Sequence, residues 1–391
     1  MTATARATSP TAAPARASGR LLYVDNIRIF LTVLVILHHL MVIYAGSGGW
    51  IYHEGRQDEL TALFGNWFCG ANQAYFMGLF LFISAYFVPG SYDRKGPARF
   101  LVDRLVRLGI PLAFYSWILR PVLIYLGLRD ELGVSFWGWY THGYFRDYGI
   151  IGGGPLWFIE LLLIFSVLYV VSRVLFRAKA APPAAAPRFP SSRAVALFAL
   201  LLVMVTFLVR LVFPVNTTFT PLNLQFANFA QYIALFVLGL VACRRNWLAA
   251  LSDATGKLWL GIALLLIAAS GPLIALMGAA ESAEPTPGGE LFSSLLSAVW
   301  EAFVCVGMCI GLVYLFRRRL DRQGRVAREL SRTAYTAYLI HEPIITFLAL
   351  FAEGVVIYPL LKFVLAALVS VPLCFGLSSL IRRLPYADRV L

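Results

Sequence analysis

The chain has 391 residues, of which 60% are hydrophobic and 14% are charged, and its formal net charge is +13. A soluble domain is nearer half apolar and a quarter charged, so the excess apolar surface must face lipid rather than water. The positive charge does not indicate nucleic-acid binding, because the basic residues form short clusters between apolar runs instead of covering one soluble face.

Residues 1–20 are rich in Ala, Thr, Pro, Ser and Arg and hold no acidic residue, which predicts a disordered tail. Residues 21–391 then form one membrane domain of the all-α class, a polytopic bundle of about ten spans, since each apolar run is near the 20 residues that cross a bilayer. The predicted spans are 27–46, 68–88, 108–127, 155–176, 194–213, 226–243, 258–277, 292–316, 333–353 and 358–380.

Basic residues fall almost entirely on one side of these spans, where they flank every second loop and both termini. Only Arg56, Arg129 and Arg146 fall on the other side. Because basic loops stay in the cytoplasm, both termini are predicted to be cytoplasmic in a multi-pass protein of the cell (inner) membrane. The same pattern supports an even number of spans, since the loss of one would move later clusters across the bilayer.

The first span carries Arg28 near its start and the adjacent pair His38 and His39 near its end. Arg28 and His39 share one helix face about 16 Å apart along the axis, and Asp25 lies one turn before Arg28. An Arg at the interface binds phosphate, and an imidazole is a general base near neutral pH. The alternative is that Arg28 extends to the interface and His39 bonds a neighbouring helix.

Other ionisable groups inside the spans need a partner or a cavity, because a charge in lipid is costly. Tyr338 and His341 share a face of the ninth span, where Pro343 follows and can kink the helix. Glu301 in the eighth span also needs a partner, and Arg120 at similar depth is the predicted one. A packing role for His341 is the alternative to a direct chemical role.

Two outer loops, 47–67 and 128–154, are rich in aromatic and polar residues, including Trp139 and His142. With Trp157 at the start of the fourth span, these side chains are candidates to contact an acceptor by stacking on sugar rings. An interfacial aromatic belt is the alternative. The five His are scattered and no carboxylates cluster, so no metal site is predicted.

Several segments in order along the chain match one family. These are Asp25–Arg28 with His39 eleven residues after Arg28, Phe80–Phe87, Arg104–Pro111, Gly154–Phe158 and Tyr335–Pro343. On these motifs the chain resembles the membrane acyltransferase-3 family, and within it the branch that succinylates periplasmic glucans.

The resemblance implies ten spans and transfer of an acyl group, acetyl or succinyl, from cytoplasmic acyl-coenzyme A. The implied acceptor is a hydroxyl outside the cytoplasm, commonly on a carbohydrate, and no cofactor is tightly bound. His39 would be the catalytic base and Arg28 a donor-binding residue, with Asp25 and Arg120 as further candidates for the donor. His38, His341, Tyr338 and Glu301 are candidates to assist.

Two other functions are consistent with the composition. A secondary transporter could use buried His, Arg and Glu as a relay, although the halves show no convincing internal repeat. A lipid-facing structural or assembly subunit would leave the aligned Arg28 and His39 unexplained.

Overall fold

The computed structural model describes residues 20–45, 48–54, 58–151, 153–176, 187–215, 217–219, 222–281 and 289–391. The predicted disordered tail therefore lies, apart from Arg20, outside the described residues. Ten stretches in the described part are long and apolar enough to cross a membrane, which confirms the predicted number.

The first five spans and the outer segment between the third and fourth contain these helices: α1 Leu22–Tyr44, α2 Glu59–Gln73, α3 Phe76–Tyr86, α4 Val88–Lys95, α5 Pro97–Arg104, η1 Leu105–Gly109, α6 Ile110–Phe114, η2 Tyr115–Leu119, α7 Arg120–Leu132, α8 Phe136–Trp139, η3 Tyr140–Tyr144, α9 Phe145–Tyr148, η4 Gly154–Leu156, α10 Trp157–Leu175 and α11 Ser192–Val212. The remaining helices are η5 Phe226–Asn228, α12 Phe229–Arg245, α13 Trp247–Ala250, α14 Asp253–Glu281, α15 Gly289–Arg319, α16 Arg325–Phe351, α17 Pro359–Ile381 and α18 Ala387–Val390. One isolated bridge pairs Phe219 with Leu224.

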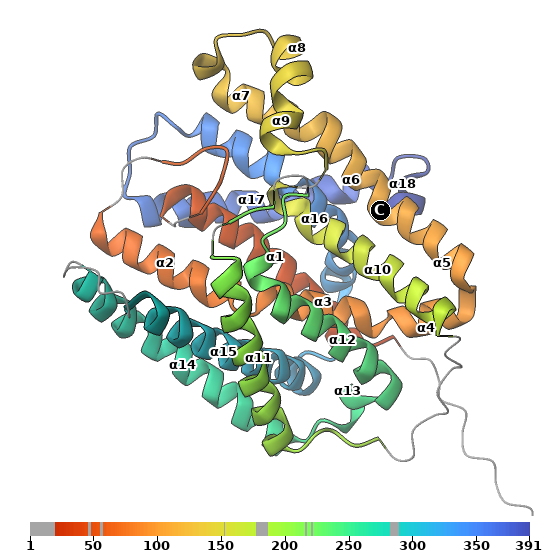
Figure 1. The fold of residues 1–391 in the computed structure, drawn as a ribbon. Coiled ribbons are helices and arrows are strands. Elements are labelled where there is room, and N and C mark those ends of the chain that lie inside the picture. The colour runs from red at the N-terminus through yellow and green to blue at the C-terminus, as the bar shows by residue number, and fades with distance from the viewer. Residues whose placement is uncertain are drawn as a thin grey trace, which may run out of the picture.

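Helix α1 lies at the centre of the bundle and packs against α2, α3, α15, α16 and α17 (Figure 1). Its sequence explains this position, because apolar residues surround the helix on every side and a helix of that kind is buried. Ile27, Leu31, Ile36, Leu40 and Ile43 have no exposed surface. The central place of α1 brings its polar residues within reach of several other helices.

Peripheral helices instead keep apolar side chains on the outer surface of the bundle. On α11, Leu197 is 68% exposed, and on α17, Leu368 is 67% exposed. In water such apolar surfaces would promote aggregation, but in a bilayer they contact the lipid chains. Exposure therefore separates the lipid-facing helices from the helices that build the interior.

Glycines let two pairs of helices approach closely. A Cβ on Gly239 of α12 would lie 2.3 Å from the carbonyl oxygen of Phe82 on α3. A Cβ on Gly307 of α15 would lie 2.6 Å from the carbonyl oxygen of Trp259 on α14. Small residues at such contacts replace the hydrophobic driving force that is missing between helices in lipid.

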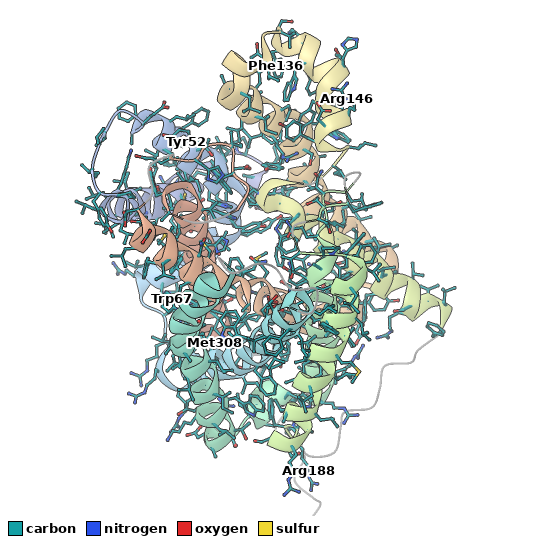
Figure 2. All side chains as sticks on the ribbon, turned by 60° about the vertical axis from the view of Figure 1, so that its left-hand side comes forward. Tyr52, Trp67, Phe136, Arg146, Arg188 and Met308 are labelled. Atoms are coloured by element: carbon teal, nitrogen blue, oxygen red, sulfur yellow. The ribbon has the colours of Figure 1, made fainter. Side chains whose placement is uncertain are left out.

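The bundle has two distinct ends. At the end that we call the basic end, the start of α1 meets the loop after α15 and the start of α16, where Arg20 donates to Ser331 and the Tyr23 backbone N–H donates to Asp321. Figure 2 shows Tyr52, Phe136 and Arg146 at the opposite end, far from Arg188. This outer end carries α7, α8 and α9, which project from the bundle in Figure 1.

Candidate active site

Two histidines from α1 and α16 meet inside the bundle. His39 Nδ1 lies 2.9 Å from His341 Nε2, and the two residues are 302 positions apart in the sequence. The ring centroids are 5.0 Å apart with an interplanar angle of 17°. The two ring planes are therefore nearly parallel, and a hydrogen bond joins the rings. We call His39 and His341 the relay, because a hydrogen-bonded pair of imidazoles can pass a proton.

The partners of His341 fix where the hydrogens lie when both rings are neutral. His341 Nδ1 is 2.5 Å from the backbone carbonyl oxygen of Tyr338, which can only accept, so Nδ1 carries the hydrogen. His341 Nε2 then accepts, and His39 Nδ1–H donates to it. His39 Nε2 is left with its lone pair, so the relay presents a neutral imidazole ready to take a proton.

The two neighbouring histidines of α1 have different surroundings. His39 is stacked under the indole of Trp50, with ring centroids 4.5 Å apart. His38 is buried, packs on the ring of Phe76 at 5.0 Å, and its Nδ1 has no hydrogen-bond partner among the described residues. The structure thus connects His39, and not His38, to His341.

The relay rests on a second buried cluster on the other side of α16. The Tyr338 hydroxyl donates to the carbonyl oxygen of Pro155, and the Tyr115 hydroxyl donates to the carboxylate of Glu342. A Cβ on Gly154 would lie 2.0 Å from the Tyr115 hydroxyl oxygen. Because the glycine leaves room for this contact, α16 is held in one position against the third span and the start of the fourth.

Sequence reasoning did not single out Tyr115 or Glu342 as functional. Glu342 offered a signal, because it is a carboxylate within a span and so needs a partner. Tyr115 offered none, since a tyrosine in an apolar run is ordinary.

Comparison with family models assigns residues 21–379 to the acyltransferase domain of the acyltransferase-3 family. The chain belongs to this family. No curated protein and no solved structure matches it. The match covers nearly the whole chain, so the ten-helix bundle is a membrane acyltransferase. The glucan-succinylating branch stays a prediction.

The predicted pairing of Glu301 with Arg120 in this acyltransferase is wrong. The carboxylate of Glu301 on α15 lies 2.6 and 3.1 Å from the guanidinium of Arg210, at the end of α11. Arg120 instead lies over the ring of Tyr148 at 5.4 Å and against Gly153. Both arginines are close to the outer end, and only helix packing decides which of them meets the glutamate. Glu301 therefore has its charge balanced by an arginine, and within the described part of the chain it forms no hydrogen bond or ion pair with His39 or His341.

The basic end of the acyltransferase holds two of the three residues predicted to bind a donor, Asp25 and Arg28. Asp25 accepts from Arg28 at 3.3 Å and from Arg20 at 2.5 Å, so one carboxylate holds two guanidinium groups. The Arg28 guanidinium also lies 4.8 Å from the ring centroid of Phe87 and keeps 37% of its side chain exposed. Arg28 is therefore held in place, and among the described residues its other N–H groups have no carboxylate partner, so they can bind an anion.

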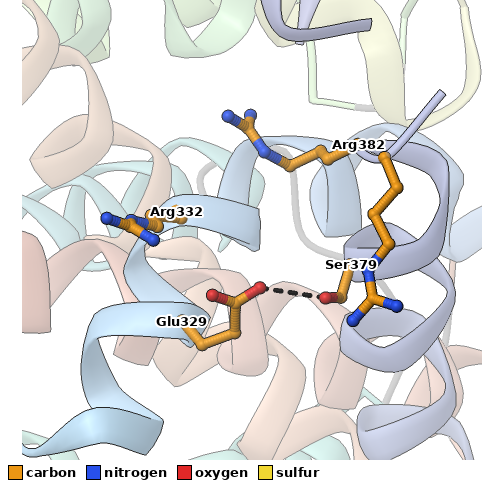
Figure 3. Close-up of a pocket in the computed structure, with 5 residues that line it drawn as sticks. Glu329, Arg332, Ser379 and Arg382 are labelled. Carbon is orange, nitrogen blue, oxygen red and sulfur yellow. Dashed lines mark hydrogen bonds between the residues drawn. The ribbon is translucent and has the colours of Figure 1, made fainter. Parts of the chain in front are cut away.

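A separate groove of about 530 Å³ opens at the same end, between the start of α16 and the end of α17 (Figure 3). Glu329 accepts from the hydroxyl of Ser379 at 2.9 Å. Arg332, Arg382 and Arg383 line the groove without an ion pair to any carboxylate in the described part of the chain. With three arginines and one glutamate, the groove adds net positive charge to the basic end.

Of the predicted acceptor-side residues, Trp139 lies in an aromatic cluster of the outer helices. It is buried with its ring centroid 5.3 Å from that of Tyr144. The Tyr144 hydroxyl donates to the carbonyl oxygen of Ser116 at 2.6 Å, and burial raises the pKa of Tyr144, which keeps this donor protonated. Trp139 thus packs within the outer helices, and the ring partners that the described residues give to His39 do not include it.

The other two predicted acceptor-side residues are also apart from the relay. His142 is exposed, with Nδ1 3.1 Å from the carbonyl oxygen of Gly138. Trp157 stacks on Tyr232 at 5.2 Å. The aromatic residue that contacts His39 is Trp50, from the other outer loop. Composition gave no reason to prefer Trp50, because both loops are rich in aromatic residues. Only the return of the chain over α1 brings Trp50 to His39.

Proposed function

We propose that this acyltransferase moves an acyl group from acyl-coenzyme A to a hydroxyl of an acceptor outside the cytoplasm, with His39 as the general base. One observation carries the proposal. The hydrogen bonds from His39 through His341 to the Tyr338 carbonyl leave the lone pair on His39 Nε2. A positioned imidazole in this state is the group that hydroxyl activation requires.

The donor is proposed to bind at the basic end, which the excess of basic residues assigns to the cytoplasm. Arg28, fixed by Asp25, would hold a donor phosphate through paired hydrogen bonds. His39 follows eleven residues later on the same helix, about 16 Å along the axis, so an extended thioester arm can lie along α1. The proposed donor site does not include Arg120, whose guanidinium lies over the ring of Tyr148 near the outer end.

In the proposed reaction, His39 Nε2 takes the proton of the acceptor hydroxyl as its oxygen attacks the thioester carbonyl carbon. The carbon–sulfur bond then breaks, and the coenzyme A thiolate leaves with the proton from His39 Nε2, which restores the neutral base. The positive charge that develops on His39 is stabilised by the Nδ1–H bond to His341. If His39 first accepts the acyl group, the same Nε2 is the nucleophile.

The acceptor is proposed to be a carbohydrate that approaches from the outer end, and the acyl group to be acetyl or succinyl. Trp50 supports this, since an indole beside the base offers a flat apolar face to a sugar ring. Both choices follow the family resemblance and are open to direct measurement.

The test is thiol release from acetyl- and succinyl-coenzyme A by purified protein in detergent, with and without a panel of sugars. His39→Ala should lower acceptor-dependent release by about 100-fold or more, the usual contribution of a general base. His38→Gln should keep most of the activity, because His38 makes no bond to the relay. Wild-type rates in folded His39→Ala protein, or equal losses in both variants, would contradict the assignment.

A further inference from the structure

The segment after α1 folds back over the end of that helix. The Glu54 backbone N–H donates to the carbonyl oxygen of Ile43 at 3.0 Å. The Trp50 backbone N–H donates to His53 Nε2 at 3.1 Å, so His53 Nδ1–H is free to donate to the carbonyl oxygen of Val42 at 3.2 Å. We call residues 48–54 the outer cap. Three hydrogen bonds, two of them to the last turn of α1, fix its course.

The outer cap places one large aromatic ring over the relay. The Trp50 indole stacks on the His39 ring, and its Nε1–H donates to the hydroxyl of Thr346 on α16 at 3.2 Å. Thr346 is only 1% exposed. The indole therefore extends from α1 to α16, the two helices that carry His39 and His341, and covers one face of the base against solvent.

A buried ion pair attaches the outer cap to a third helix. Lys362 of α17 lies 2.7 Å from the carboxylate of Glu54, and its ammonium group lies 5.7 Å from the ring centroid of Tyr44. The Lys362 side chain is 4% exposed. A buried pair of this kind gains little over an apolar contact, but the loss of either partner leaves a buried charge unpaired. Its effect here is to hold the cap in one position.

We propose that the outer cap keeps water from His39, so that the activated thioester passes its acyl group to the acceptor and not to water. The inference rests on the proposed function. If water reaches the base, its oxygen attacks the thioester carbonyl, the carbon–sulfur bond breaks, and the products are a free carboxylic acid and coenzyme A thiol. Trp50 is then a positioning residue, and the Glu54–Lys362 pair is what keeps it over His39.

The experiment measures two rates in purified protein: thiol release without acceptor, which is hydrolysis, and acylated acceptor by mass spectrometry, which is transfer. Trp50→Ala and Lys362→Met should each raise the rate of hydrolysis itself, and the ratio of hydrolysis to transfer should rise at least tenfold over wild type. A ratio that rises only because transfer falls would indicate a lost acceptor contact and would contradict water exclusion by the outer cap. Trp137→Ala is the matched control, because Trp137 lies at the outer end, is 69% exposed and does not contact the relay. It should leave the ratio unchanged.

A charge swap tests the ion pair itself. Glu54→Lys combined with Lys362→Glu should bring the ratio of hydrolysis to transfer back toward the wild-type value. Glu54→Lys alone or Lys362→Glu alone should leave this ratio raised. The proposal that the outer cap excludes water would be contradicted by an unchanged ratio in folded Trp50→Ala and Lys362→Met proteins. A parallel fall in the rates of hydrolysis and transfer would also contradict it. Addition of His39→Ala to Trp50→Ala should abolish hydrolysis as well. Hydrolysis that persists in this double variant would overturn the base role of His39, which separates the two proposals.

Discussion

Replacement of His341 by Leu tests the relay most directly. The substitution removes the acceptor of the His39 Nδ1–H, so the ring loses the bond that fixes its tautomer and that stabilises its protonated form. A hydrogen bond to a charged group contributes about 1.5–3 kcal/mol. With 1.36 kcal/mol for each factor of ten in rate, kcat should fall about 10- to 150-fold. The loss should be smaller than that of His39→Ala, because the base itself remains.

His341→Gln is the matched variant, since a glutamine carbonyl oxygen reaches nearly as far as imidazole Nε2 and can accept the same hydrogen. The expected order of kcat is wild type, His341→Gln, His341→Leu and then His39→Ala. Thiol release under saturating donor and acceptor gives kcat, and the nitrogen NMR shifts of labelled His39 report its tautomer. An unchanged kcat for folded His341→Leu protein would refute the relay.

Three further predictions concern other parts of the molecule. Arg28→Gln should raise KM for acyl-coenzyme A with little change in kcat, and an effect on kcat alone would remove Arg28 from donor binding. Gly154→Ala should lower Tm, because φ is +50° and the new Cβ would lie 2.0 Å from the Tyr115 hydroxyl oxygen; a wild-type Tm would show that the turn relaxes freely. Arg210→Leu should lower the free energy of unfolding by about 3 kcal/mol, because it leaves Glu301 unpaired. Arg210→Leu combined with Glu301→Leu should recover part of this loss, as measured by thermal unfolding.

The membrane spans show which features can be predicted from short stretches of sequence. Their number and approximate positions followed from runs of apolar residues, but the predicted single helix of the second span contains breaks near Tyr75 and Phe87. The third span contains two π-helical turns, η1 and η2. These irregularities depend on how the helix packs against its neighbours, so hydrophobicity did not indicate them.

The candidate active site likewise has one part that the sequence predicted and one part that it did not. Arg28 and His39 were found together because they lie on one helix, where spacing fixes their relation. The partner of His39 could not be chosen from the sequence, since His341 is 302 residues away and its role depends on the contact between α1 and α16. The prediction for Glu301 failed for this reason, because two arginines could meet its need for a partner and α11 brings Arg210 to it.

The sequence alone determined that this protein resides in a membrane, how many times it crosses, and which helix carries the candidate base. Each of these properties depends on short stretches of sequence. The hydrophobicity of a stretch decides whether it lies in lipid, and the charge of its flanks decides which side of the membrane they face. Only the tertiary structure decided that His39 meets His341, that Trp50 covers the base and that Glu54 is bound by Lys362. In lipid one apolar helix face is nearly equivalent to another, so the choice of neighbours depends on close packing and on polar pairs that form only when the helices assemble.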